Sequence, residues 1–215
     1  MIHLYPTSIR IMLKSRKQTD PTTEEKIIES ARKLFTEKGY NAIKTRDIAK
    51  EAGVNLALLN YYFRSKENLF EIIMKENFKK FIKIISEIIN DEHTSIWQKI
   101  EMLVANYIEM LSLNPDMPLF VLSHTNQDPQ RAKFREKFIE SYFLKQVQKA
   151  IKSGEIAPIN PVDLMLNIVG LTIFPFVGRQ MLINNKGITK DQFNELMKER
   201  KKMIPKWIKA MLKVK

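Results

Sequence analysis

Cysteine is absent from this sequence of 215 residues, and glycine and proline are scarce, with 6 and 9 copies. A chain without cysteine forms no disulfide and no thiolate metal site, which fits the reducing cytoplasm, where we expect this protein. The 3 histidines stand far apart and lack metal-ligand spacing. No glycine-rich phosphate loop and no G-x-S-x-G motif occurs either. These absences argue against an enzyme, and we expect no catalytic residue, no metal and no cofactor.

Long apolar runs are also missing. The longest uncharged one, Ile168 to Gly178, has about half of the roughly twenty residues that a membrane-spanning helix needs, and no signal peptide is evident. We therefore expect a soluble protein with no membrane partner. The formal net charge of +12 and the pI of about 9.7 indicate a polyanionic partner, unless they reflect only solubility or a generally basic proteome.

The composition favours helices, because apolar residues recur at helical spacing and no segment alternates as a strand would. We predict an all-α protein. Residues 1–19 form a flexible basic arm that either touches DNA or has no role. Residues 20–66 form an N-terminal three-helix DNA-binding domain with a helix-turn-helix. A long helix over residues 67–90 links this domain to the rest, and residues 67–215 form a larger C-terminal helical domain for ligand binding and dimerisation.

The C-terminal domain is expected to contain several further helices. Pro205 should kink or restart the last of them, because proline lacks the backbone N–H that a helix interior uses. The helices are predicted over residues 96–113, 118–124, 130–152, 162–183 and 190–202.

The segment from Thr45 to Lys66 organises the N-terminal domain. Gly53 stands where a left-handed residue ends a first short helix without steric cost. Asn55 follows at a position that caps a second helix, whose Leu59 and Phe63 lie four residues apart on one inward face. Two short helices around a glycine turn predict a helix-turn-helix, in which the second helix enters a DNA major groove.

A set of residues in and around this motif, taken together with their spacing, is more informative about the protein family than the helix-turn-helix alone. The set consists of Ala31, Leu34, Phe35, Gly39, Tyr40, Thr45, Ile48, Ala49, Ala52, Gly53, Val54, Leu59, Tyr62, Phe63, Lys66 and Leu69. It resembles the TetR family of bacterial transcriptional regulators over about residues 23–70. The resemblance implies a homodimeric DNA-binding repressor, less often an activator. It also implies a C-terminal domain that binds a small ligand and dimerises through its last two long helices.

The start of the first motif helix offers candidate phosphate contacts. Thr45 either holds a phosphate with its hydroxyl and the exposed backbone N–H groups, or only caps the helix. Lys44 and Arg46 flank it as further phosphate contacts or as solvated charges. Asn55 caps the second helix, touches a phosphate or reaches a base.

The second motif helix, Leu56 to Tyr62, is expected to read the bases. The resemblance implies contacts to the DNA backbone by the Tyr62 hydroxyl and by Lys66. Asn60 can bind adenine through two hydrogen bonds, and the two leucines can contact thymine methyl groups or tuck against the core. Four residues depart from those that the family often has, and we expect them to set the base preference: Leu56, Leu58, Asn60 and Tyr61.

The C-terminal half contains apolar and aromatic residues that are candidates for lining a ligand cavity between helices. For each of them the alternative is an ordinary place in the core, and His124 is the expected polar handle unless it is a core or surface residue. The candidates are Trp97, Tyr107, Met110, Phe120, His124, Phe143, Met165 and Phe174. This composition suits a largely apolar small-molecule effector.

A homodimer interface is expected on the last helices. Gly170, Phe174 and Gly178 are spaced four apart, so two small residues share a helix face and allow close approach. Together with Phe193 and Met197 of the following helix, they predict a four-helix bundle across a two-fold axis. The alternative is that the same face packs within one chain.

We therefore predict a DNA-binding transcriptional repressor that binds a palindromic operator as a homodimer and is released by a small, largely apolar ligand. The alternative is a basic helical protein that binds a membrane surface or a protein partner, because the helix over residues 67–90 is rich in isoleucine and amphipathic. Salt-dependent binding to duplex DNA, but not to anionic liposomes, distinguishes the two.

Overall fold

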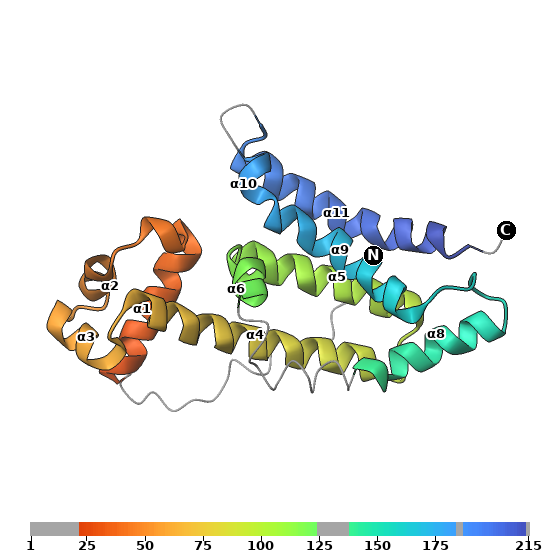
Figure 1. Cartoon of the computed structure of the whole chain (residues 1–215), viewed down its shortest axis with the longest axis horizontal. Helices are drawn as coiled ribbons and strands as arrows, with labels where there is room; N and C mark the ends of the chain where they lie inside the picture. The colour runs from red at the N-terminus through yellow and green to blue at the C-terminus, as the bar shows by residue number, and fades with distance from the viewer. Residues whose placement is uncertain (1–21, 124–137, 184–186, 214–215) are drawn as a thin grey trace, which may run out of the picture.

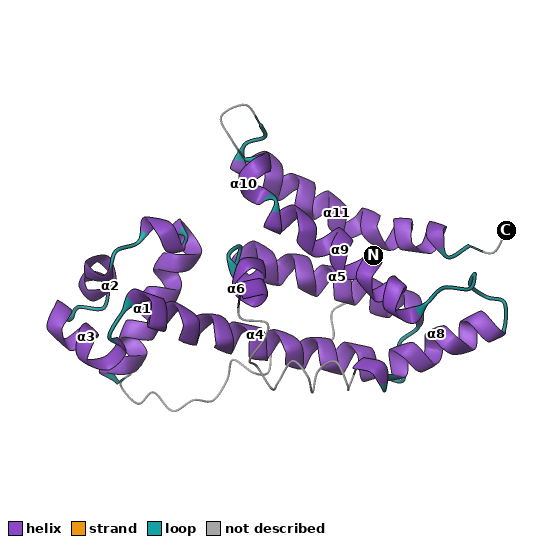
Figure 2. Ribbon diagram, in the orientation of Figure 1, coloured by secondary structure: helices purple, strands orange, loops and turns teal. Residues whose placement is uncertain are grey.

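Helices make up the regular structure of the part of the chain that the structure describes (Figure 2). The structure is a computed structural model that describes residues 22–123, 138–183 and 187–213. Within these residues no strand occurs. The predicted all-α class is confirmed.

Three short helices form the N-terminal domain, at the left of Figure 1: α1 (Thr23–Lys38), α2 (Thr45–Glu51) and α3 (Leu56–Phe63). Thr22 and Glu25 form a reciprocal capping box that satisfies two backbone N–H groups at the start of α1. Helices this short are marginal in water, so their stability comes from burial of one apolar face each. The buried residues are Ile27, Ala31, Leu34, Phe35, Ile48, Ala49, Leu59 and Phe63.

The long helix α4 (Lys66–Asn90) connects the two halves of the molecule. Its 25 residues extend over about 37 Å at 1.5 Å per residue. One end packs against α1 and α3, and the other end packs against α5 and α8 (Figure 1). Because a single cluster of buried apolar residues continues along α4, the two halves share one core.

The C-terminal half is built around α5, which packs against α4, α8, α9 and α11. In Figure 1, α9 and α11 cover one side of α5, and α4 covers the other. The helices are α5 (Ile96–Leu113), α6 (Met117–Ser123), α8 (Tyr142–Lys152), α9 (Pro161–Val177), α10 (Arg179–Leu182) and α11 (Lys190–Met211).

Some helix boundaries differ from the predicted ones. The helix expected over residues 130–152 is interrupted in its described part: residues 138 and 139 are helical, and α8 begins anew at Tyr142. The Ser141 hydroxyl accepts the Leu144 N–H and caps α8 there. Residues 130–137 lie outside the described residues. The helix expected to continue to residue 183 ends at Val177, and α11 passes through Pro205 without a restart.

The turn between α4 and α5 is fixed by a buried lysine. Lys99 is completely buried, and its ammonium group donates to the backbone oxygens of Asp91 and Thr94 and to the Thr94 hydroxyl. Burial lowers the pKa of Lys99, and the nearby Asp91 charge partly opposes this effect. Gln146 of α8 also donates to the Thr94 oxygen, at 2.8 Å, so one short turn holds three helices together.

Candidate DNA-binding interface and ligand cavity

The turn between α2 and α3 has the geometry of a helix-turn-helix. Gly53 adopts φ +67°, a left-handed conformation that favours glycine. The Asn55 side chain accepts the Leu58 N–H at 2.7 Å, which confirms the predicted cap. Leu59 and Phe63 are buried and anchor α3 on the domain core. The opposite face of α3 is thereby presented to solvent.

The solvent face of α3 gathers the side chains that were predicted to read DNA. Leu56 and Asn60 are exposed, Tyr61 is 79% exposed, and Tyr62 is 41% exposed. The rings of Tyr61 and Tyr62 meet edge to face at 5.4 Å. Leu58 is half-buried, so one part of its side chain faces the domain core and the other part belongs to the solvent face of α3. This face combines an amide, two phenol hydroxyls and apolar groups.

The start of α2, the helix that precedes α3 in the sequence, carries two basic side chains. The Lys44 N–H donates to the Asp47 carboxylate at 2.8 Å, and Thr45 is the first residue of the helix. Lys44 and Arg46 are exposed. Among the described residues, Arg46 has no ion-pair partner within 4.0 Å, so its guanidinium group is available for a phosphate.

Lys66 has a structural role that the sequence did not predict. Its ammonium group donates to the backbone oxygens of Tyr40 and Ile43, at 3.1 and 3.0 Å, and lies 3.9 Å from the centre of the Tyr40 ring. The Tyr40 hydroxyl donates to Glu67 at 2.9 Å, and burial together with this bond raises the pKa of Tyr40 to about 12. These contacts fix the start of α4 against the loop that precedes α2.

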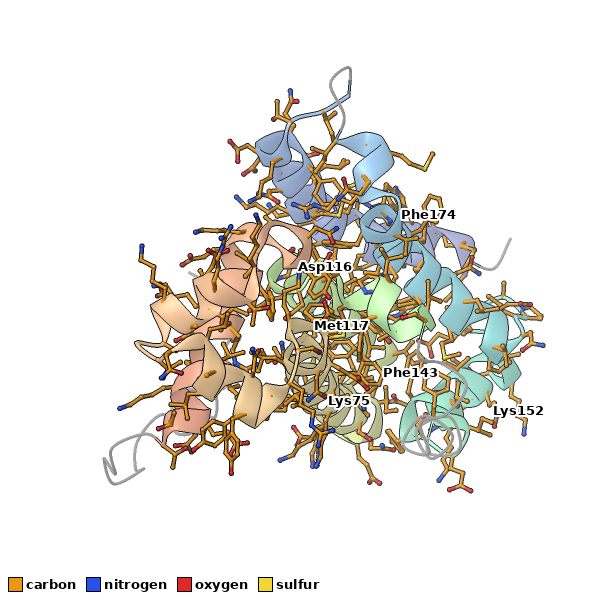
Figure 3. All side chains as sticks on the ribbon, turned by 60° about the vertical axis from the view of Figure 1, so that its left-hand side comes forward. Lys75, Asp116, Met117, Phe143, Lys152 and Phe174 are labelled. Atoms are coloured by element: carbon orange, nitrogen blue, oxygen red, sulfur yellow. The ribbon has the colours of Figure 1, made fainter. Side chains whose placement is uncertain are left out.

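A polar bridge joins the N-terminal domain to the C-terminal half. Arg32 of α1 donates to the Asn77 side chain of α4 at 2.8 Å, and Asn77 donates to the Asn114 side chain at the end of α5 at 2.7 Å. The Tyr40 N–H donates to the Asp116 carboxylate at 3.3 Å, and Asp116 is labelled in Figure 3. Segments on both sides of α4 are therefore linked by directional contacts as well as by apolar packing.

A small apolar cavity lies among α4, α5, α8 and α9, with a volume of about 30 Å³. It brings together three of the predicted ligand residues, Tyr107, Phe143 and Met165. Figure 3 labels Phe143, which is buried on α8. The sequence did not single out the other lining residues, because they are aliphatic or aromatic residues of ordinary core spacing: Ile85, Leu103, Phe138, Ile168 and Val169.

The remaining predicted ligand residues lie elsewhere. Trp97 is half-buried beside the Lys209 ammonium group, 5.4 Å from the ring centre. Phe120 is buried, and its ring meets that of Phe70 edge to face at 6.2 Å. Met110 is half-buried but does not line the cavity, Phe174 is exposed on α9, and His124 lies outside the described residues.

Tyr107 is the polar member of the cavity. Its ring packs edge to face on Phe81, with 4.7 Å between the centroids. Within the described part of the chain, no group shares a hydrogen bond with its hydroxyl. Burial alone raises the pKa of Tyr107 to about 12, so the hydroxyl is neutral over the physiological range.

The candidate dimer residues divide into two groups. Phe174 is 72% exposed, Gly170 is exposed, and a Cβ added at Gly170 would meet no atom within 4 Å. Phe193 and Met197 are buried in their own protomer, where Phe193 packs edge to face on Phe176. These two side chains are therefore not accessible to a partner, and Gly178 is half-buried at the end of α9.

Two apolar stripes on the last long helices are accessible instead. On α9, exposed residues recur every four positions, which places them on one face. They are Val162, Leu166, Gly170 and Phe174. On α11 the exposed apolar residues are Leu196, Met203, Trp207 and Met211. The sequence missed the α11 set because its apolar residues cover more than one face of that helix.

In the part of the chain that the structure describes, no helix has the length and apolar character needed to cross a membrane. The arrangement of α1–α3 instead defines a protein with an N-terminal helix-turn-helix domain joined through one long helix to a helical C-terminal domain. Residues 27–73 match the sequence profile of the bacterial regulatory proteins of the tetR family. The helix-turn-helix domain is therefore similar in sequence to the DNA-binding domain of the tetR family.

Individual relatives agree with this assignment. The chain is 31% identical over 126 residues to the probable HTH-type transcriptional regulator YttP of Bacillus subtilis (strain 168), across 59% of this chain and 56% of that protein. The alignment thus spans little more than half the length of that relative. The fold is similar to that of PfmR from Thermus thermophilus, with a TM-score of 0.57, 17% identity and coverage of 90% of this chain and 97% of that chain. It is also similar to that of Bacillus subtilis FadR in complex with stearoyl-CoA, with a TM-score of 0.50, 22% identity and coverage of 83% and 96%.

Proposed function

We propose that the chain is a transcriptional repressor that binds a palindromic DNA operator as a homodimer. The observation that carries this proposal is the exposed face of α3, which is held outward by the buried Leu59 and Phe63. Two such helices, about one DNA turn apart, read two half-sites and give useful specificity. Dimerisation through the exposed stripes of α9 and α11 supplies the second copy. A bound dimer represses by occupying DNA that the polymerase needs.

We further propose that a small, largely apolar ligand releases the repressor. The apolar cavity lies against α4, the helix that also supports the reading domain. The stearoyl-CoA named for the FadR structure is an apolar chain on a large polar carrier, which supports an apolar ligand here. A ligand larger than the cavity has to separate α4 from α5, and a coupling free energy of about 1–3 kcal/mol is sufficient to change operator affinity.

The test of the proposed function is selection of bound duplexes from a random DNA pool. We expect enrichment of a symmetric site with two half-sites. Asn60→Ala should then relax the preference at one base pair per half-site, because an asparagine that binds adenine through two bonds contributes about 1–3 kcal/mol of discrimination. A pool with no enriched sequence would refute operator binding, and an unchanged preference would remove Asn60 from direct readout.

The salt dependence of binding to the selected duplex separates phosphate contacts from positioning contacts. Arg46→Gln should lower the slope of log K against log[salt] by about 0.9 per protomer, because each lost phosphate contact removes released counterions. We expect Lys66→Met to weaken binding to all sequences with an unchanged slope, because two donors of Lys66 already bind backbone oxygens. A reduced slope for Lys66→Met would assign a phosphate to that ammonium group.

A further inference from the structure

The cavity among α4, α5, α8 and α9 contains an unusual combination of groups. Its described lining is apolar except for Tyr107, and it includes no charged side chain. The Met165 thioether is only a weak acceptor. The Tyr107 hydroxyl is therefore the one strong hydrogen-bonding side-chain group among these lining residues, and no described residue shares a hydrogen bond with it.

Such a cavity discriminates against two kinds of ligand, anions and pure hydrocarbons. The Tyr107 side chain is half-buried, and its hydroxyl has no partner among the described residues, so a ligand oxygen that bonds to it supplies a hydrogen bond that these residues do not provide. An anion placed among these walls would lose its hydration and find no cation in exchange. A hydrocarbon would fill the space and leave the hydroxyl without a partner.

From this geometry we infer that the effector is a neutral apolar molecule with one hydrogen-bonding oxygen, such as an alcohol, phenol, ketone or ester, which bonds to the Tyr107 hydroxyl. Any anionic group of a natural effector stays outside the cavity. The inference rests on the proposed function, in which this cavity is the effector site. The raised pKa of Tyr107 supports it, because a neutral phenol serves as either donor or acceptor.

The cavity also requires movement on binding. At about 30 Å³ it holds no more than about two water molecules, so a molecule of two fused rings has to displace the walls. Ile85 of α4 and Met165 of α9 face the same space. Methionine adapts its shape readily, whereas displacement of Ile85 moves the helix that leads to the reading domain.

Three matched probes test the inference on the full-length protein: 2-naphthol, naphthalene and 2-naphthoate, each measured by equilibrium dialysis with fluorescence detection. We expect 2-naphthol to bind at least about tenfold more tightly than 2-naphthoate, because the anion is desolvated without compensation. Tyr107→Phe should weaken 2-naphthol about fivefold, as for the loss of one hydrogen bond, and leave naphthalene unchanged. Tyr142→Phe, on α8 but not among the lining residues, is the matched control and should behave as the wild type.

Equal binding of 2-naphthol to Tyr107→Phe and to the wild type would overturn the role of Tyr107. Binding of 2-naphthoate as tight as that of 2-naphthol, or no binding of any probe up to saturation, would overturn the ligand class. Thermal melts of both variants verify that they are folded. Operator binding is measured separately without any probe, so a failure of this inference is distinguishable from a failure of the proposed DNA function.

Discussion

Phe174→Glu should convert the protein from a dimer to a monomer and lower operator affinity by at least about 100-fold. The side chain is 72% exposed on α9, in line with Val162, Leu166 and Gly170. In a two-fold interface each substitution occurs twice, so two carboxylates would be buried without partners. A monomer binds each half-site independently and loses the effective concentration that links the two sites, which is commonly a factor of about 10²–10⁴.

Sedimentation velocity and a titration of the selected operator measure the two effects. Ile84→Glu changes an exposed isoleucine on α4 in the same way and should leave both unchanged. Gly170→Lys offers a second variant, because Gly170 is exposed and a Cβ added there meets no atom within 4 Å, so the position itself accepts a side chain. A dimeric Phe174→Glu protein with wild-type operator affinity would show that α9 is not the interface.

Lys99→Met should lower the stability of the protein by about 3 kcal/mol. The substitution retains the apolar stem but removes every donor, so the half-buried backbone oxygens of Asp91 and Thr94 lose this partner and Thr94 keeps only the Gln146 donor. For a chain of this size, 1 kcal/mol corresponds to about 2–4 °C, so the melting temperature should fall by about 6–12 °C.

The matched control for this substitution is Lys145→Met on α8, where the lysine is exposed. Its melting temperature should stay close to that of the wild type, because single exposed charges contribute little. Thermal unfolding followed by circular dichroism measures both variants. Equal melting temperatures for the two variants would show that the buried ammonium group of Lys99 is not needed to hold the α4–α5 turn.

The sequence predicted the helix-turn-helix well because its signals are local. The Gly53 turn, the Asn55 cap and the four-residue spacing of Leu59 and Phe63 act within a few residues, and each has the predicted conformation or burial. The contacts of Lys66 were not predictable in this way. The backbone oxygens of Tyr40 and Ile43 come near it only when α4 has packed against the loop before α2.

The C-terminal sites show the same limit. α11 has apolar residues on its buried face and on its exposed face, so the periodicity that identifies the helix does not tell Phe193 from Trp207. The rotation of the helix about its axis, set by packing against α5 and α9, decides which of them is accessible. Likewise, Tyr107 and Trp97 lie on the same helix, but only Tyr107 turns toward the cavity.

The polar bridge at Asn77 divides α4 into two segments of unequal length. Asn77 is hydrogen-bonded to both halves of the molecule. It lies eight residues, or about 12 Å, from Ile85 at the cavity. It lies eleven residues, or about 16 Å, from Lys66 at the N-terminal domain. With Asn77 as the fulcrum, a rigid rotation of α4 moves Lys66 in the direction opposite to Ile85 and about 1.4 times as far. Under such a rotation, a displacement of Ile85 by about one ångström would move Lys66, at the N-terminal domain, by about 1.4 Å.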